Sequence, residues 1–264
     1  MHGSYRLYWV QTIFRLNRGR VIAMCGRFLL RTPPESWPAD LVSNLDGEFS
    51  DIRLQPNLTG LFEPRQNVSP TQSVLAIVQP KAGGLRELRA LRWGLVPSWA
   101  KDRSIGAKMI NARAETVDEK PSFRTAFSRQ RCLIPADGYY EWIKTDDGKQ
   151  PMLIERQSSD LFCFAGLWEQ NRSLTYDKEA QAVREGGDEA QIQSRPLSTC
   201  TIITTAANPS MQSIHDRMPV IIEPSEYVRW LDPAFRDVTA LKRLLHAAEE
   251  GFFESKPVGK VAGR

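Results

Sequence analysis

Short apolar runs, several of them rich in β-branched residues, recur along this chain and predict many strands. We expect strands at residues 26–31, 73–79, 86–95, 131–135, 152–155, 161–167, 198–205 and 219–222. The Gly83-Gly84 pair predicts a turn joining 73–79 to 86–95, and 152–155 with 161–167 are expected to form a second hairpin. Residues 198–205 (STCTIITT) are expected at the centre of a sheet, because β-branched residues pack well on a pleated surface. Residues 219–222 are expected at its edge.

Helical periodicity of apolar residues is confined to two segments near the end of the chain. Residues 226–231 and 238–248 show it, with Ser225 and Asp237 as expected N-caps. The proline-rich residues 32–38 predict a loop that leads into a short helix. Many short strands with few helices indicate an α+β fold, with a barrel-like, mostly antiparallel sheet at its core.

Three polar segments are expected to lie outside this core. Residues 44–66, with Pro56, Gly60 and Pro64, predict a loop or insertion. Residues 169–196 are charged and poor in apolar residues, so we expect a surface insertion that is partly helical around 178–184. Residues 255–264 are expected to form a flexible tail. The predicted organisation is therefore a leader at 1–24, one domain at 25–254 and a tail.

Charge is distributed unevenly between the leader and the body of the chain. The formal net charge is +4, and residues 1–24 contain four arginines and no acidic residue. The body from Cys25 onward is therefore neutral. Contacts with phosphate would have to come from a local cluster of arginines and not from an overall positive field.

The leader itself allows several interpretations. Gln11, Thr12 and Arg15 interrupt the apolar run that a secretory signal needs. The basic, acid-free composition also resembles a mitochondrial transit peptide, although serine is scarce. We favour upstream sequence translated from a misassigned start codon, with a pro-segment removed by self-cleavage as the remaining interpretation. In either of these two cases Cys25 becomes the first residue.

The cysteines and the hydropathy indicate a protein of the reducing cytosol. The four cysteines are widely spaced and form no CxxC pair, so neither a disulfide framework nor a zinc site is expected. Cys163 and Cys200 lie in apolar stretches and are expected to be buried and inert. No run approaches the roughly 18–20 apolar residues of a membrane span. We expect no membrane partner, metal or other cofactor.

Met24-Cys25 has a specific chemical implication. Removal of an initiator methionine would leave Cys25 with a thiol and a free α-amine. The amine condenses with an aldehyde to a Schiff base, and the thiolate then closes a thiazolidine ring. Ordinary pKa values of about 7.7–8.0 for the amine and about 8.5 for the thiol leave both partly reactive at neutral pH. An internal cysteine lacks this chemistry because its nitrogen is an amide.

Polar residues also crowd into six segments where the chain otherwise has the pattern of a core. The segments are MCGRF from Met24, NVSPT from Asn67, LRWGLVPSW from Leu91, NARAET from Asn111, PADGYYEW from Pro135 and IHDRMP from Ile214. In this order they resemble the SRAP (SOS response-associated peptidase) family, whose members cross-link to abasic sites in single-stranded DNA. The resemblance runs from Cys25 to about Pro224.

The resemblance implies an activity and a setting for this chain. It implies one SRAP domain with a channel for single-stranded DNA that leads to an N-terminal cysteine. The expected activity is abasic-site processing by lyase-like Schiff-base chemistry that ends in a covalent cross-link, together with autopeptidase activity. A bacterial protein is expected, working as a monomer in the cytoplasm near the nucleoid and replication.

The resemblance also implies four catalytic residues. Cys25 is the expected nucleophile, and the neutral amide of Asn111 would orient its amine without protonating it. Glu141 stands between Tyr140 and Trp142, so desolvation is expected to raise its pKa and suit it to shuttle protons. His215 is expected to hydrogen-bond the ring-opened sugar and assist proton transfer. The alternatives are structural roles: a buried cysteine, a turn-capping asparagine, a surface glutamate and a core histidine.

A second set of residues is expected to contact DNA. It comprises Arg27, Arg113 and Arg217 on phosphates, Trp93, Trp99 and Pro70 against bases or sugars, and Asn67, Thr205 and Asn208 as further contacts. Arg92 and Lys101 are possible extensions of the basic strip. Stacking on aromatic side chains tolerates any sequence, so binding should be sequence-independent. Core packing is the alternative role for both tryptophans.

Two other functions are compatible with these residues. The first is a peptidase or amidohydrolase with an N-terminal cysteine nucleophile, acting chiefly on its own leader. The second is a single-strand-binding module without a covalent step, whose binding would disappear at high salt. The second leaves the cysteine behind Met24 unexplained.

Overall fold

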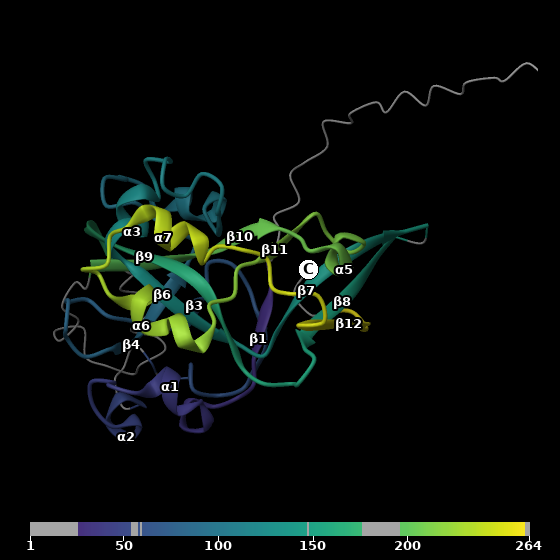
Figure 1. The fold of residues 1–264 in the computed structure, drawn as a ribbon, viewed down its shortest axis with the longest axis horizontal. Coiled ribbons are helices and arrows are strands. Elements are labelled where there is room, and N and C mark those ends of the chain that lie inside the picture. The colour runs from purple at the N-terminus through teal and green to yellow at the C-terminus, as the bar shows by residue number, and fades with distance from the viewer. Residues whose placement is uncertain (1–25, 54–57, 59, 147, 176–195, 262–264) are drawn as a thin grey trace, which may run out of the picture.

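The computed structural model describes residues 26–53, 58, 60–146, 148–175 and 196–261 of the 264-residue chain. Cys25, the leader and the helix expected around 178–184 lie outside these residues. Within them the protein is α+β, as predicted, with two sheets and a few short helices (Figure 1).

Five strands close into a mixed barrel. Their order is β10 (Pro196–Ala206), β4 (Glu87–Trp93), β3 (Ser73–Val78), β6 (Arg131–Ala136) and β9 (Phe162–Thr175), and β9 pairs with β10 to complete the ring. Only the β10–β4 pairing in this ring is parallel. The β3–β4 hairpin and the central place of β10 are both confirmed.

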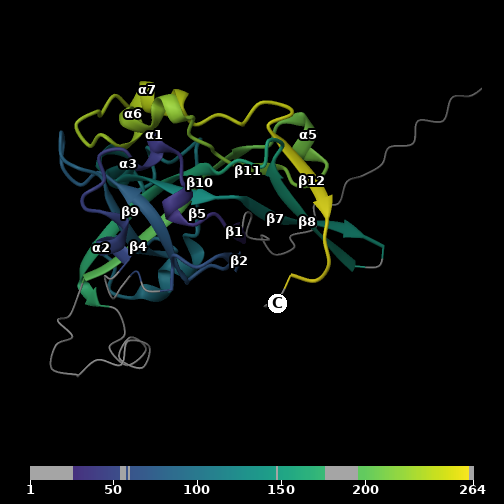
Figure 2. The ribbon, with the colours of Figure 1, turned by 90° about the horizontal axis from the view of Figure 1, so that it is seen from below.

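The second sheet is antiparallel and stands beside the barrel. Its order is β12 (Phe253–Pro257), β8 (Gly148–Arg156), β7 (Gly138–Thr145), β1 (Phe28–Leu30) and β2 (Arg65–Val68). The β7–β8 hairpin extends away from the barrel in both views (Figures 1 and 2). Phe28 joins the two sheets, because its ring packs edge-on against Trp93 at 5.4 Å and Phe164 at 5.7 Å.

The helices are short, and most of them lie around the barrel (Figures 1 and 2). They are η1 (Pro34–Ser36), α1 (Ala39–Val42), α2 (Phe49–Arg53), η2 (Arg103–Lys108), α3 (Arg124–Arg129), α5 (Pro209–Gln212), η4 (Pro224–Glu226), α6 (Tyr227–Leu231) and α7 (Val238–Arg243). Asp237 caps α7 by accepting a hydrogen bond from the backbone of Ala240, as predicted. Ser225 was expected to cap the preceding helix but lies inside η4, so that prediction is wrong. No helix in the described part of the chain combines the length and apolar character that a membrane crossing requires.

A buried arginine holds the helical side of the barrel together. Arg131 is fully buried, and its guanidinium donates to the backbone carbonyls of Phe127, Trp230, Asp232 and Phe235. Desolvation lowers its pKa to about 10. Carbonyl acceptors on every side compensate for the burial of the charge, which is the condition under which an arginine is tolerated in a core.

The second predicted hairpin is wrong. Strand β8 pairs with β7 and β12 in the antiparallel sheet, whereas β9 pairs with β6 and β10 in the barrel. Residues 157–161 therefore cross from one sheet to the other. The hairpin partner of β8 is the strand before it, because β7 and β8 are paired from Gly138 and Glu155 up to Thr145 and Gly148.

Three predicted boundaries also need correction. Strand β9 continues through residues 169–175, which were assigned to a surface insertion, and Asn171 there is buried and bonded to the carbonyls of Pro97 and Ala100. The edge strand expected at 219–222 is β11 (Arg217–Pro219). The tail expected from residue 255 begins inside β12, which is hydrogen-bonded to β8.

Candidate active site

Strand β10 organises the candidate site because each of its two edges pairs with two other strands. Its first half pairs with β4 on one edge and β9 on the other, and its last residues pair with β5 (Asn111–Arg113) and β11. Asn111 lies opposite Ile202, and Arg217 lies opposite Ala206. Two segments that are about a hundred residues apart in the sequence thereby meet across one strand.

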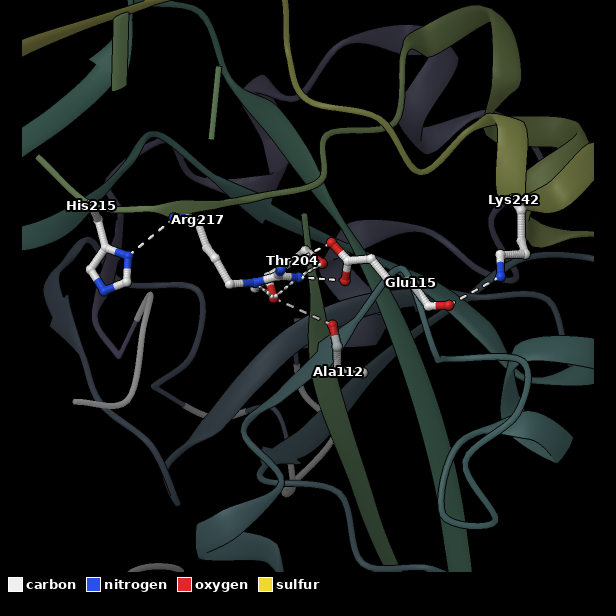
Figure 3. A network of polar contacts seen from close by, with 6 residues as sticks. All are labelled: Ala112, Glu115, Thr204, His215, Arg217 and Lys242. Carbon is white, nitrogen blue, oxygen red and sulfur yellow. Dashed lines mark hydrogen bonds and ion pairs between the residues drawn. The ribbon is translucent and has the colours of Figure 1, made fainter. Parts of the chain in front are cut away.

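His215 lies just before β11 and is half-buried. Its Nδ1 accepts a hydrogen bond from the backbone N–H of Arg217 at 3.2 Å and lies 2.7 Å from the Asp216 carboxylate. Burial lowers the pKa of His215, and this outweighs the opposing effect of the largely exposed Asp216. The neutral imidazole is therefore the dominant form at pH 7. Figure 3 shows Nε2 on the side of the ring away from Arg217.

Glu141 is buried on β7, beside the start of β1. Its exposed fraction is 4%, so a solvated surface glutamate is excluded. The preceding residue, Tyr140, donates its backbone N–H to the carbonyl of Arg27 at 2.9 Å. The buried carboxylate is thus one residue away from the hydrogen bond that anchors the chain just after Cys25. The raised pKa expected for Glu141 stays a prediction.

Arg27 and Asn67 meet on neighbouring strands of the antiparallel sheet. Arg27 Nη1 donates to Asn67 Oδ1 at 3.0 Å, which ties the start of β1 to β2. Next to this pair is a cavity of about 280 Å³. Its lining consists of Gln66, Asn67, Tyr140, Val258, Gly259, Lys260 and Val261. The half-buried Pro70 lies two residues after the end of β2.

The two tryptophans of the LRWGLVPSW segment have opposite environments. Trp93 is 0% exposed and donates its indole N–H to the carbonyl of Ile110 at 2.9 Å. The prediction that it contacts DNA is wrong, because no part of the ring reaches the surface. Trp99 is 60% exposed. Gly94, with φ +122°, lies against Gly106, where a Cβ would come within 2.6 Å of the Gly106 carbonyl. This close approach holds the loop that carries Trp99.

Asn208 is also a structural residue. It is 8% exposed, and its side chain accepts from the backbone of Met211, which caps α5, and donates to the carbonyl of Ala248 at 2.9 Å. The amide is therefore already engaged within the fold, and the DNA contact expected of Asn208 stays a prediction. Thr205 is half-buried next to it, whereas Arg113 and Lys101 are exposed.

Arg217 has protein acceptors in place of the expected phosphate. Its Nη1 and Nη2 donate to the two carboxylate oxygens of Glu115, each at 2.9 Å, and Nη2 also donates to the carbonyl of Thr204 at 2.7 Å (Figure 3). The hydrogen bonds from Arg217 lower the pKa of Glu115. Lys242 on α7 completes the network by donating to the Glu115 carbonyl and pairing with Asp118.

Sequence reasoning missed Glu115 and Thr204 as partners of the site. The available signal was the acidic residue inside NARAET, two positions after Arg113, which only the pairing of β5 and β11 with β10 connects to Arg217. Within the described residues, no group of three or more histidine, cysteine, aspartate or glutamate side chains is arranged to hold a metal ion.

Comparison with known proteins agrees with this architecture. Residues 24–264 match the family described as SOS response associated peptidase (SRAP). The chain is 41% identical over 244 residues to the abasic site processing protein YoqW of Bacillus subtilis, covering 90% of this chain and 93% of YoqW. It is 30% identical over 206 residues to the abasic site processing protein HMCES of Xenopus tropicalis, covering 71% and 59% of the two chains.

Solved structures share the fold. A protein from Bacteroides thetaiotaomicron matches with a TM-score of 0.69 at 22% identity, covering 89% of this chain and 92% of that one. A phage-related protein from Bordetella bronchiseptica matches with a TM-score of 0.63 at 27% identity, covering 90% and 96%.

Proposed function

This chain belongs to the SRAP family, and from that membership we propose that it processes abasic sites in DNA. Relatives that align over most of this chain carry the name abasic site processing protein. We propose further that the DNA is single-stranded and that the product is a covalent thiazolidine formed by Cys25.

The register between β1 and β7 is the observation that carries this proposal. Arg27 accepts the backbone hydrogen bond of Tyr140, and the next residue is the buried Glu141. Cys25 precedes Arg27 by two residues, and two residues span at most about 7 Å. This connectivity supports the proposal that Cys25 is the nucleophile and acts close to a buried carboxylate. A carboxylate in such surroundings is suited to transfer protons.

The chemistry balances without a cofactor. The Cys25 α-amine attacks the aldehyde carbon of the ring-opened abasic sugar to give a carbinolamine, which loses water to form an imine. The Cys25 thiolate then adds to the imine carbon, and the nitrogen takes up a proton. The C–N and C–S bonds replace the C=O bond, whose oxygen leaves as water. No oxidant or reductant is consumed.

Each candidate residue has a step in this scheme. Asn111 would orient the amine by hydrogen bonding, because an amide cannot protonate it. Glu141 would carry protons during loss of water and ring closure. His215, neutral at pH 7, would donate a hydrogen bond from Nε2–H to a sugar oxygen, since Nδ1 already accepts from the backbone N–H of Arg217.

Exposed residues would hold the strand. Trp99 offers a ring on which any base can stack, and the exposed guanidinium of Arg113 would contact phosphate. Arg27, Asn67 and Pro70 would line the approach beside β1. Because all the candidate residues are on one chain, we also propose that a monomer is sufficient. We propose separately that the protein works on DNA in the cytoplasm.

The test uses protein that begins at Cys25. Incubation with a single-stranded oligonucleotide carrying one abasic site should give a conjugate that survives heat and detergent. Cys25→Ser should give none, because its hydroxyl cannot replace the thiol in closing a stable ring. An undamaged oligonucleotide and a protein with one extra residue before Cys25 are the controls. A wild-type protein that gives no conjugate, or an extended protein that reacts equally well, would refute the mechanism.

The residues ahead of Cys25 and the family description favour a second activity, which is self-removal of that leader. Cys25 would act as nucleophile, with Glu141 and His215 assisting proton transfer. Intact-mass measurement of full-length protein should show loss of residues 1–24 in the wild type and retention in Glu141→Gln and His215→Ala. Equal loss in all three proteins would assign the removal to ordinary trimming or internal initiation.

A further inference from the structure

Glu115 and Arg217 form a bidentate ion pair, which we call the clamp. Two parallel N–H···O bonds of 2.9 Å join the guanidinium to the carboxylate, and the Thr204 carbonyl accepts a third bond at 2.7 Å. Figure 3 shows the Arg217 guanidinium between Thr204 and Glu115. Bidentate arginine–carboxylate pairs are the strongest and most directional ion pairs in proteins.

This clamp acts on the residue whose backbone holds His215. The N–H of Arg217 donates to His215 Nδ1, and Arg217 pairs with Ala206 of β10. Fixing the Arg217 side chain to Glu115 and Thr204 therefore fixes the backbone N–H that orients the imidazole. Glu115 is therefore connected to His215 through Arg217 of β11, whose side chain donates to Glu115 and whose backbone N–H donates to His215.

The low exposure of the Arg217 side chain argues against a role in binding a DNA phosphate. The Arg217 side chain is 14% exposed, whereas that of Glu115 is 48% exposed. The Arg217 guanidinium is mostly covered, and both of its terminal nitrogens already donate to protein acceptors, which leaves little of it accessible to a phosphate. Arg113, exposed two residues before Glu115, needs no such exchange.

We propose that Glu115 is a positioning residue that orients His215 through Arg217 in the cross-linking reaction. The inference rests on the proposed function, because it assigns to His215 a part in that reaction. Glu115 touches neither the substrate nor the imidazole in this role, and it acts by holding Arg217.

The experiment compares Glu115→Gln with Asp118→Asn. The first substitution removes the charge of the clamp and places an amide group against one guanidinium N–H. The second removes a neighbouring ion pair on the same segment, that of Asp118 with Lys242, without touching Arg217. A third variant, Arg217→Lys, keeps the positive charge but cannot form the two parallel bonds. Thermal unfolding identifies any variant that does not fold.

The readout separates reaction rate from DNA binding. Adduct formation by the Cys25-start protein is measured over a range of abasic-oligonucleotide concentrations. Glu115→Gln should slow the reaction at saturating DNA by about tenfold to a hundredfold, because small misplacements of a reacting group have effects of this size. The half-saturating DNA concentration should stay within about twofold of the wild-type value. Arg217→Lys should be equally slow, and the double variant no slower, because the two residues form one unit.

Nuclear magnetic resonance provides a readout that does not depend on activity. The Cys25-start chain contains two histidines, His215 and His246. At fixed pH, Glu115→Gln should shift the Cε1–H signal of His215 and leave that of His246 in place. Asp118→Asn should shift neither signal.

The outcomes are distinguishable. Slow reaction at saturation together with a shifted His215 signal supports the proposal. Wild-type rates in Glu115→Gln overturn it, and so does an altered DNA affinity with an unchanged maximal rate, which would make Arg217 a phosphate ligand. If the wild-type protein forms no adduct at all, the proposed function fails, and an unshifted His215 signal would then refute the coupling separately.

Discussion

Trp93 and Trp99 are six residues apart, and their different surroundings suit them to different roles. Trp93 packs against Phe28 and donates to Ile110, so it stabilises the junction between the two sheets. Trp99 presents its ring to solvent. Asn208 and Arg217 follow the same rule as Trp93, because each has its polar atoms engaged by partners within the fold. At the scale of single residues, prior engagement decides which side chains remain for a ligand.

Alanine substitutions should separate the two tryptophans. Trp99→Ala should weaken non-covalent binding to abasic single-stranded DNA by about 1–3 kcal/mol and leave stability nearly unchanged. Trp93→Ala should lower the free energy of unfolding by about 3–5 kcal/mol, as expected for a large core side chain. Fluorescence anisotropy in a Cys25→Ser background and chemical denaturation measure the two quantities. Equal effects of both substitutions on binding would contradict the assignment.

At the scale of elements, the ends of strands determine what the site contains. β10 is long enough to close the barrel and still carry β5 and β11 beyond it. β12 covers the edge of β8, and the residues after it pack on the outer face of the antiparallel sheet, where Val258 and Val261 contact the cluster of Leu29, Tyr140 and Leu153. The chain after residue 254 is therefore part of the sheet that holds Glu141.

Truncation after Glu254 should destabilise the protein. It removes most of β12, the backbone bond from Val258 to Pro151 and the contacts of the two valines, so we expect a loss of about 2–4 kcal/mol in the free energy of unfolding. The control is Lys256→Gln, which breaks only the ion pair of the exposed Lys256 with the buried Glu155. It should change stability by less than about 1 kcal/mol, because Glu155 keeps its ion pair with Arg31. Urea denaturation measures both. A truncated protein as stable as the control would restore the flexible tail first expected there.

At the scale of the whole molecule, the core encloses three of the four cysteines. Cys132, Cys163 and Cys200 are buried without disulfides in the barrel. Burial raises the pKa of the Cys163 thiol to about 12, and it raises the pKa of Cys132 and Cys200 as well. Since the thiolate is the reactive form, the core keeps all three inert at neutral pH.

Thiol counting should reveal this burial. At pH 8, native Cys25-start protein should react rapidly with one equivalent of Ellman's reagent, and with four after unfolding in guanidinium, because the chain has four cysteines. Cys25→Ser should give no rapid reaction when native. Two or more fast thiols in the native wild type would show that the barrel does not protect its cysteines.

Local signals account for the parts of the fold that were predicted correctly. The Gly83-Gly84 turn between two apolar runs and the Asp237 cap are interactions between near neighbours, so a single sequence contains the information. Strands β8 and β9 are also close in sequence, but they belong to different sheets. Their partners were decided by packing of the whole core, which no local pattern records.

The sequence by itself determined which chemical groups are candidates for the site and the α+β class that carries them. Cysteine behind Met24, Asn111, Glu141 and His215 were all identifiable from short segments. Only the tertiary structure decided which groups are available, since it buried Trp93, committed Asn208 to a helix cap and joined Arg217 to Glu115. The physical reason is that exposure and hydrogen-bond partners depend on residues distant in the chain, and strand pairing around β10 brings those residues together.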